Sequence, residues 1–162
     1  MMKQFYPLIN SNGRIVNVSS MSSQQTLNNF PQNSTHRQTL HSINRDLELE
    51  ELEHAARQFI IDEENKKGKN WPSKNGKDWP KSAYGVSKVL VNGITRIYAK
   101  RADQDKNGVL VNCCCPGYVR SDMTRHNANA TKDPTEGAST SLWLALLPPG
   151  LPGPQGCYLA DA

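Results

Sequence analysis

A tyrosine and a lysine stand four residues apart in the segment SAYGVSKVLVNG, which runs from Ser82 to Gly93. If this segment is helical, Tyr84 and Lys88 lie on the same face, one turn apart. A neighbouring ammonium group favours the charged form of a phenol and lowers its pKa, which makes the phenol a better proton donor and base near neutral pH. Two unrelated residues on a solvated helix would show the same spacing, so this pair needs support from its surroundings.

A serine and a proline–glycine pair are the other candidates for a site. Ser20 ends the apolar segment GRIVNVSS, and Pro116 and Gly117 end the apolar segment GVLVNCCCPG. A serine hydroxyl can stabilise an oxygen that gains negative charge, as a carbonyl oxygen does when a hydride is added to its carbon. Ser20, Tyr84 and Lys88 together therefore predict the reduction of a carbonyl group.

Strands that alternate with helices are expected to position these residues. GRIVNVSS and GVLVNCCCPG predict buried strands that are apolar on both faces, GCYLADA predicts a third strand, and helices are expected at about 82–105 and 135–147. This order is typical of an α/β fold in which right-handed crossovers place parallel strands side by side. Function gathers at the carboxyl ends of such strands, where Ser20 and Pro116 are expected.

The region between the first strand and the Tyr84 helix is long and varied. Residues 21–44 are rich in Ser, Gln, Asn and Thr and are predicted to be loop, whereas residues 47–65 have the apolar spacing of a helix whose other face is acidic. A basic tract follows, in which a Gly-Lys-x-Trp-Pro unit occurs twice and predicts a loop. We interpret residues 21–81 as an insertion into the α/β domain.

The composition favours one globular domain. The chain has 162 residues, a formal net charge of +4 and no apolar run of the roughly 18 residues that a membrane span needs. The N-terminus does not have the pattern of a signal peptide. Cys113, Cys114 and Cys115 are consecutive, so on a strand they point to alternate faces and cannot gather around one metal ion. We expect buried thiols in a reducing, cytoplasmic compartment and predict no metal site.

The motifs GRIVNVSS, SAYGVSK and NCCCPGYVRSDM, in this order, resemble the C-terminal half of a short-chain dehydrogenase/reductase, and most of all the monomeric carbonyl reductases of that family. The resemblance implies a partial Rossmann-type doubly wound parallel sheet with a helical insertion. It also implies NADPH-dependent reduction of ketones, aldehydes or quinones to alcohols. The long insertion covers the helix face through which other members form oligomers, so the resemblance implies a monomer.

The same resemblance assigns roles to individual residues. Ser20 would orient the substrate carbonyl, with its neighbour Ser19 as the second choice, and Tyr84 would be the acid and base. Lys88 would assist Tyr84 and hydrogen-bond the nicotinamide ribose. The residues implied to line the nicotinamide end of the cofactor are Pro116, Gly117, Val119, Arg120 and Ser121.

The chain departs from the family pattern in one respect. The glycine-rich turn that holds the cofactor pyrophosphate at a helix N-terminus is not found, and neither is the helix asparagine of the family's catalytic tetrad. We therefore expect residues 1–162 to be the C-terminal part of a single reductase domain. On its own this chain is expected to bind NADPH weakly and to lack activity.

Two other hypotheses remain open. The chain could be a catalytically inactive remnant that acts as an interaction module and pairs its open strand edge with another chain. It could also bind nucleic acid through the lysines of the basic tract with Trp71 and Trp79 between them. Because the preceding helix is acidic and would repel phosphate, we favour a solvated loop and a small-molecule carbonyl substrate, with no nucleic-acid partner.

Overall fold

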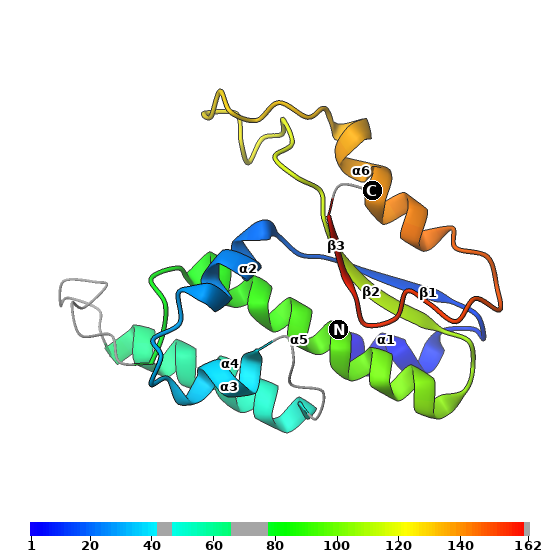
Figure 1. Cartoon of the computed structure of the whole chain (residues 1–162), viewed down its shortest axis with the longest axis horizontal. Helices are drawn as coiled ribbons and strands as arrows, with labels where there is room; N and C mark the ends of the chain where they lie inside the picture. Colours follow the sequence, from blue (N-terminus) through cyan, green and yellow to red (C-terminus); the bar gives the residue numbers. More distant parts are fainter. Residues whose placement is uncertain (42–46, 66–77, 161–162) are drawn as a thin grey trace.

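The computed structural model describes residues 1–41, 47–65 and 78–160. Three parallel strands form one sheet in the order β1-β2-β3: β1 (Arg14–Val18), β2 (Leu110–Cys115) and β3 (Tyr158–Ala160). Figure 1 shows helix α5 (Ala83–Asp105) along one face of the sheet and α6 (Pro134–Ala145) along the other. The predicted α/β architecture with parallel strands side by side is therefore confirmed.

β2 is the central strand, and all six of its residues are buried. β1 pairs with it from Arg14 opposite Leu110 to Val18 opposite Cys114, which brings the carboxyl ends of the two strands to the same edge. The prediction that β1 is buried on both faces is wrong, since its residues are half-buried and Val18 is 54% exposed. β1 is more exposed than predicted because it is an edge strand, and among the described residues its one strand neighbour is β2.

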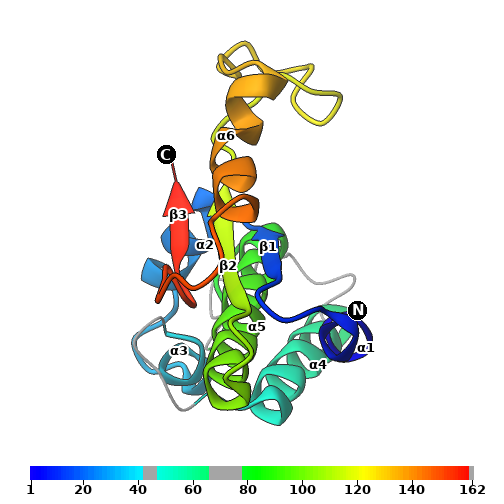
Figure 2. The same cartoon turned by 90° about the vertical axis from the view of Figure 1, so that its right-hand side faces the viewer.

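Helix α5 organises the core. It begins where the Ser82 Oγ accepts the Gly85 N–H at 2.9 Å, and it ends at Lys106, which adopts a left-handed conformation. One side of the helix packs on the sheet, in a cluster made of Tyr6, Tyr98, Ala99, Ala102, Val109 and Val111. A second cluster joins its first half to the insertion. Figure 2 shows α6 on the side of the sheet away from α5, where Leu144 of α6 and Leu147 just after it pack against β2. The predicted helices at 82–105 and 135–147 are both present.

Residues 21–41 are not the loop that their composition predicts, and residues 42–44 of the same prediction lie outside the described residues. Residues 21–41 contain α2 (Met21–Asn28) and α3 (Thr35–Leu40), and α2 begins at Ser20, whose Oγ accepts the Ser22 N–H at 3.2 Å. A serine at this position satisfies a backbone donor that the first helical turn leaves without a partner. Burial of Ser23, Thr26 and Leu27 stabilises a segment whose own helix propensity is low. Tertiary packing here outweighs local preference.

The predicted acidic helix is α4 (Leu49–Asn65), and it packs against α5 as expected of an apolar stripe. The spacing in the sequence predicts an apolar stripe of Leu49, Leu52, Ala56, Phe59 and Ile60, and two of these residues differ in the structure. Ala55 is buried in place of Ala56, and Ile60 is 55% exposed. Among the described residues, no helix combines the length and the apolar character that crossing a membrane requires.

The structure describes only the last four residues of the duplicated Trp-Pro tract, 78–81, which include Trp79. Residues 66–77, Trp71 among them, lie outside the described residues. The Trp79 ring is 4% exposed and stacks on His36 with the ring centroids 4.1 Å apart, while its Nε1–H donates to Asp62 Oδ2 at 2.9 Å. A tryptophan buried in this way cannot stack on a nucleotide base. The nucleic-acid hypothesis is therefore wrong about Trp79.

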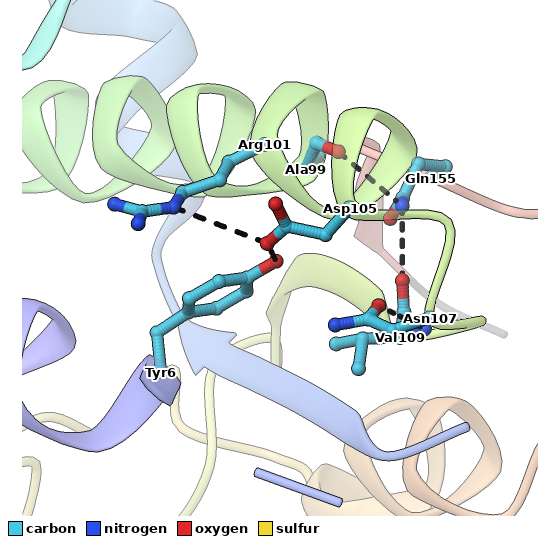
Figure 3. A network of polar contacts seen from close by, with 7 residues as sticks. All are labelled: Tyr6, Ala99, Arg101, Asp105, Asn107, Val109 and Gln155. Carbon is cyan, nitrogen blue, oxygen red and sulfur yellow. Dashed lines mark hydrogen bonds and ion pairs between the residues drawn. The ribbon is translucent and has the colours of Figure 1, made fainter. Parts of the chain in front are cut away.

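Polar contacts tie the N-terminal segment to the last residue of α5, and a second group of contacts lies next to the amino end of β2 (Figure 3). Helix α1 (Met2–Phe5) leads into a 3₁₀ turn, η1 (Tyr6–Leu8), in which the Tyr6 hydroxyl donates to Asp105 Oδ2 at 2.8 Å. Burial and the Asp105 carboxylate raise the pKa of Tyr6 to about 12, so the phenol remains a donor at neutral pH. Close by, Gln155 donates to the carbonyls of Ala99 and Val109. These bonds fix the end of the sheet opposite to the predicted site.

Candidate active site

The carboxyl ends of β1 and β2 border one cleft of about 630 Å³, a size usual for small-molecule sites. Its walls come from the β1–α2 turn, the first turn of α5 and the loop after β2. The lining residues are Ser19, Ser20, Met21, Ser22, Gln25, Tyr84, Cys115, Pro116, Gly117, Tyr118, Val119, Ser121, Met123 and Thr124. Of the predicted site residues, the structure thus brings together Ser20, Tyr84, Pro116, Gly117, Val119 and Ser121, while Lys88 and Arg120 lie outside the lining.

The two neighbouring serines at the end of β1 have different surroundings. The Ser19 side chain is buried and donates to Asn92 Oδ1 at 2.5 Å, so its hydroxyl proton is already used inside the protein. The Ser20 Oγ accepts the Ser22 N–H through a lone pair, which leaves its own proton free for donation. Ser20 is therefore the serine that can donate into the cleft.

Tyr84 and Lys88 lie on the same face of α5, as their spacing predicts. Tyr84 is 49% exposed and borders the cleft from the first turn of the helix. The Lys88 Nζ is 5.6 Å from the centroid of the Tyr84 ring and donates to the carbonyl oxygen of Val18 at 3.0 Å. This bond to the last residue of β1 holds the ammonium group between the strand and the phenol.

The loop after β2 turns sharply at Gly117, which has a φ of 77°. A Cβ added there would lie 3.0 Å from Lys132 Cδ and Nζ, so a glycine allows the lysine to pack directly on the backbone. Further along the loop, the Arg120 N–H donates to the Lys132 carbonyl at 2.8 Å. Arg120 is thus held by its backbone beside the cleft, although its side chain is not part of the lining.

Sequence reasoning missed two residues of the cleft that hold its shape. The Thr124 hydroxyl donates to the Val119 carbonyl at 2.5 Å and accepts the Ser121 N–H at 2.9 Å, which folds the loop back on itself. The Ser-x-x-Thr spacing of such a turn could have indicated this. Cys115 closes the floor of the cleft, and its Sγ accepts the N–H groups of Met21 and Gly117 at 3.2 and 3.4 Å.

The other two cysteines of β2 behave as the sequence predicts. Cys113 and Cys114 are buried, and this burial raises the pKa of the Cys113 thiol to about 12 and also raises the pKa of Cys114. Neither takes part in the cleft. Among residues 1–41, 47–65 and 78–160, no group of three or more His, Cys, Asp or Glu side chains could hold a metal ion.

The sequence of this chain is similar to those of several known proteins. A family model described as short chain dehydrogenase matches residues 70–132, which include Tyr84, Lys88 and the loop after β2. Carbonyl reductase [NADPH] 1 of Mus musculus is 41% identical over 165 residues, which cover 98% of this chain and 54% of the mouse protein. The protein of the same name from Homo sapiens is 39% identical, with 98% and 53% covered. The chain is therefore similar to about half of a short-chain dehydrogenase/reductase.

Solved structures of reductases show a similarity over the same part of the fold. Salutaridine reductase from Papaver somniferum superposes with a TM-score of 0.74 at 28% identity, covering 99% of this chain and 50% of that structure. Menthone neomenthol reductase from Mentha piperita gives 0.68 at 31% identity, covering 99% and 45%. The chain spans about half the length of the curated relatives it matches. The family resemblance read from the three motifs and the partial Rossmann-type sheet are therefore confirmed.

The cleft combines two kinds of wall. On one side, Ser20 and Tyr84, which both carry a hydroxyl group, line the same space, and the Lys88 Nζ is 5.6 Å from the centroid of the Tyr84 ring. On the other side, residues 116–119 form a wall without a charged side chain. Two proton donors opposite an uncharged wall suit a polar, uncharged reacting group such as a carbonyl.

Proposed function

We propose that this chain carries the reactive centre of an NADPH-dependent carbonyl reductase, in which Ser20, Tyr84 and Lys88 are the catalytic residues. The observation that carries the proposal is that Ser20 and Tyr84, from distant parts of the sequence, line the same cleft while Lys88 lies beside Tyr84. The relatives named carbonyl reductase [NADPH] support the choice of reaction and cofactor. Ketones, aldehydes and quinones are the substrate classes proposed.

The chemistry follows from the order in which charge develops. NADPH, when bound, would be the source of the hydride that the carbonyl carbon receives. As the carbonyl oxygen becomes negative, Tyr84 gives its hydroxyl proton to that oxygen, so the phenolic O–H bond breaks and the alcohol O–H bond forms. Ser20 donates a hydrogen bond to the same oxygen, and the Lys88 ammonium stabilises the phenolate that remains. No other charged group needs to enter the cleft.

The residues after β2 fit the nicotinamide end of the cofactor. A flat, uncharged ring needs a wall without bulky or charged side chains, and Pro116, Gly117 and Val119 provide one along the cleft. Ser121 borders the same space and offers a hydroxyl, while Tyr84 and Lys88 would face the ribose from the other side. Arg120 is proposed as a further contact on the family pattern alone, since its side chain does not line the cleft.

The assembly proposed is a monomer. Helix α4 packs on α5, and a Cβ added at Gly93 of α5 would lie 2.6 Å from the Leu52 Cδ1 of α4. A helix face covered this closely by the protein's own insertion is not free for a second subunit. Size-exclusion chromatography with light scattering should give the mass of one chain.

One observation favours the alternative of an interaction module. In the part of the chain that the structure describes, β1 pairs with β2 and with no other strand, and Val18 near its end is exposed. A strand with a free edge can accept a strand from another chain. The two functions do not exclude each other, because a strand added to β1 would extend the sheet without covering the Tyr84 side of the cleft.

The test of catalysis uses a chimera in which all 162 residues replace the matching part of the mouse carbonyl reductase. We expect this chimera to oxidise NADPH when a quinone, aldehyde or ketone is present. Tyr84→Phe should lower kcat by roughly 10²- to 10⁴-fold because it removes the proton donor. Tyr118→Phe is the matched control, since it removes a hydroxyl from the same cleft without a lysine one turn away, and it should lose less than about tenfold. A folded chimera whose turnover is equal in the two variants would contradict the proposal.

The isolated chain offers a second measurement. We expect it to bind NADPH only in the millimolar range, because its sequence contains no glycine-rich turn to hold the pyrophosphate. A fluorescence titration of the cofactor gives the dissociation constant. Submillimolar affinity would show that this chain holds the cofactor without that turn.

A further inference from the structure

Asn92 is a buried polar residue of α5 that none of the proposed chemistry uses. It follows Lys88 by one helical turn and Tyr84 by two, so the three residues share one face of the helix. Its amide makes hydrogen bonds in two directions: Oδ1 accepts from the Ser19 hydroxyl at 2.5 Å, and Nδ2 donates to Ser23 Oγ at 2.9 Å. An amide buried at this depth and paired on both sides has a definite orientation.

The two partners of Asn92 flank Ser20 on either side. Ser19 precedes it at the end of β1, and Ser23 lies one turn into α2, where its hydroxyl donates to the Ser20 carbonyl at 2.7 Å. The side chains of Ser19 and Ser23 are both buried, so water does not compete for these bonds. A single amide from α5 thus fixes the backbone before and after the serine that faces the cleft.

We propose that Asn92 is a positioning residue that sets Ser20 at its working distance from Tyr84. This inference rests on the proposed function of Ser20. Because Asn92 belongs to the same helix as Tyr84 and Lys88, it links the β1–α2 turn to the helix that carries the proton donor. The Lys88 bond to the Val18 carbonyl makes a second, shorter link between the same two elements. The relative position of the two hydroxyl groups is therefore set by hydrogen bonds from α5, and not by the turn alone.

The effect of losing this link follows from geometry. Asn92→Ala leaves the hydroxyl groups of Ser19 and Ser23 without their shared partner, so the turn that carries Ser20 can shift. A displacement of about 1 Å at a catalytic group lowers turnover by roughly 10²-fold. We expect Asn92→Ala in the chimera to lower kcat by about 10- to 100-fold, with KM changed by less than about threefold, since Asn92 does not line the cleft.

The control must remove a buried polar group from the same helix without touching Ser20. Thr95→Val does this, because Thr95 is fully buried and its Oγ1 accepts from Asn17 on β1 at 2.8 Å. It should lower the melting temperature much as Asn92→Ala does, yet leave kcat within about twofold of the unmodified chimera. In a Ser20→Ala background, Asn92→Ala should cause no further loss of kcat, since its action passes through Ser20. Equal kcat values for the Thr95 and Asn92 variants, or losses that multiply in the double variant, would overturn the proposal.

A measurement on the isolated full chain separates this inference from the proposed function. Hydrogen exchange of the Ser22 and Ser23 amides reports the start of α2, where both amides bond to Ser20. Asn92→Ala should speed their exchange at least tenfold more than Thr95→Val does. Ser23→Ala, which removes one of the two hydrogen-bond partners of Asn92, is the milder variant if Asn92→Ala does not fold, and it should speed exchange of the amides at positions 22 and 23 by a smaller factor. If the unmodified chimera has no activity, accelerated exchange still supports the positioning role, and unchanged exchange refutes it.

Discussion

Gly85 lies where α5 packs against Thr26 of α2, one residue after the proposed proton donor. A Cβ added at Gly85 would stand 1.8 Å from Thr26 Oγ1 and 2.9 Å from Thr26 Cβ. Rotation of the threonine side chain can move Oγ1 away but leaves its Cβ where it is, so relief requires α2 itself to move. Gly85→Ala therefore tests whether the contact between these helices sets the geometry of the cleft.

The size of the effect comes from two opposing contributions. Inserting a methyl group into a packed interface costs about 1–3 kcal/mol, and replacing glycine by alanine in a helix returns up to about 1 kcal/mol. We expect Gly85→Ala to lower the free energy of unfolding by about 1–2 kcal/mol. Because α2 begins at Ser20, the same shift should lower kcat of the chimera at least tenfold.

The assay is urea unfolding of the full chain followed by circular dichroism. Gly93→Ala is the matched control, because a Cβ there meets the flexible end of Leu52 at 2.6 Å and should change the unfolding free energy by less than about 1 kcal/mol. Thr26→Ala removes the atom nearest to the new methyl group, so it should recover about 1 kcal/mol when combined with Gly85→Ala. The reasoning fails if Gly85→Ala is as stable as the parent, or if its cost is the same with Thr26→Ala.

Three further predictions concern the rest of the molecule. Iodoacetamide should modify Cys157 alone in the folded chain and all four cysteines after unfolding, as mass spectrometry would show, because the thiols of β2 are buried and the pKa of Cys113 is raised to about 12. Burial against Trp79 lowers the pKa of His36 below its ordinary value, so the folded state binds this proton less readily than the unfolded chain; thermal stability at low salt should fall as the pH drops below about 6.5, and less so in His36→Gln. Asp133→Ala should destabilise the chain by about 1 kcal/mol in urea unfolding, since it removes the cap that accepts two N–H groups of α6, whereas Asp133→Asn should retain most of it.

The strands and the long helices could be predicted because their signals are local. β2 is an unbroken apolar run that ends at a proline, and α5 begins at a serine cap and keeps its apolar spacing over six turns. Alternation of strand and helix was then enough to place the carboxyl ends of β1 and β2 side by side. Since Ser20 and Pro116 are located by those ends, much of the candidate cleft followed from topology.

The sequence did not predict helix α2, and the reason is physical. Its sequence, MSSQQTLN, has few apolar residues and poor helix propensity, so nothing within it favours a helix over a loop. What stabilises it is the surface of α5, where Gly85 leaves room for Thr26, together with the cap at Ser20. A contact between residues about sixty positions apart has no signature in either segment alone. The role of Cys115 in the cleft was missed for the same reason, since its partner Met21 is 94 positions away. The Thr124 turn is local, and its Ser-x-x-Thr spacing was a signal that the sequence analysis did not use.

The choice between Ser19 and Ser20 shows what a sequence pattern can determine and what only the structure can. Both residues carry the same hydroxyl and follow the same strand, so their chemistry cannot distinguish them. Successive side chains of an extended segment point to opposite sides, which means that one serine must turn toward α5 and the other toward the cleft. Asn92 decides which: its amide accepts the Ser19 proton inside the protein, and the Ser20 hydroxyl is left facing the cleft that Tyr84 lines. If Asn92 were replaced by an apolar residue, Ser19 would lose the partner that holds its proton inside the protein, but the alternation along the strand would still leave Ser20 as the serine on the cleft side. The expected result is therefore a displaced Ser20, and not a change of donor.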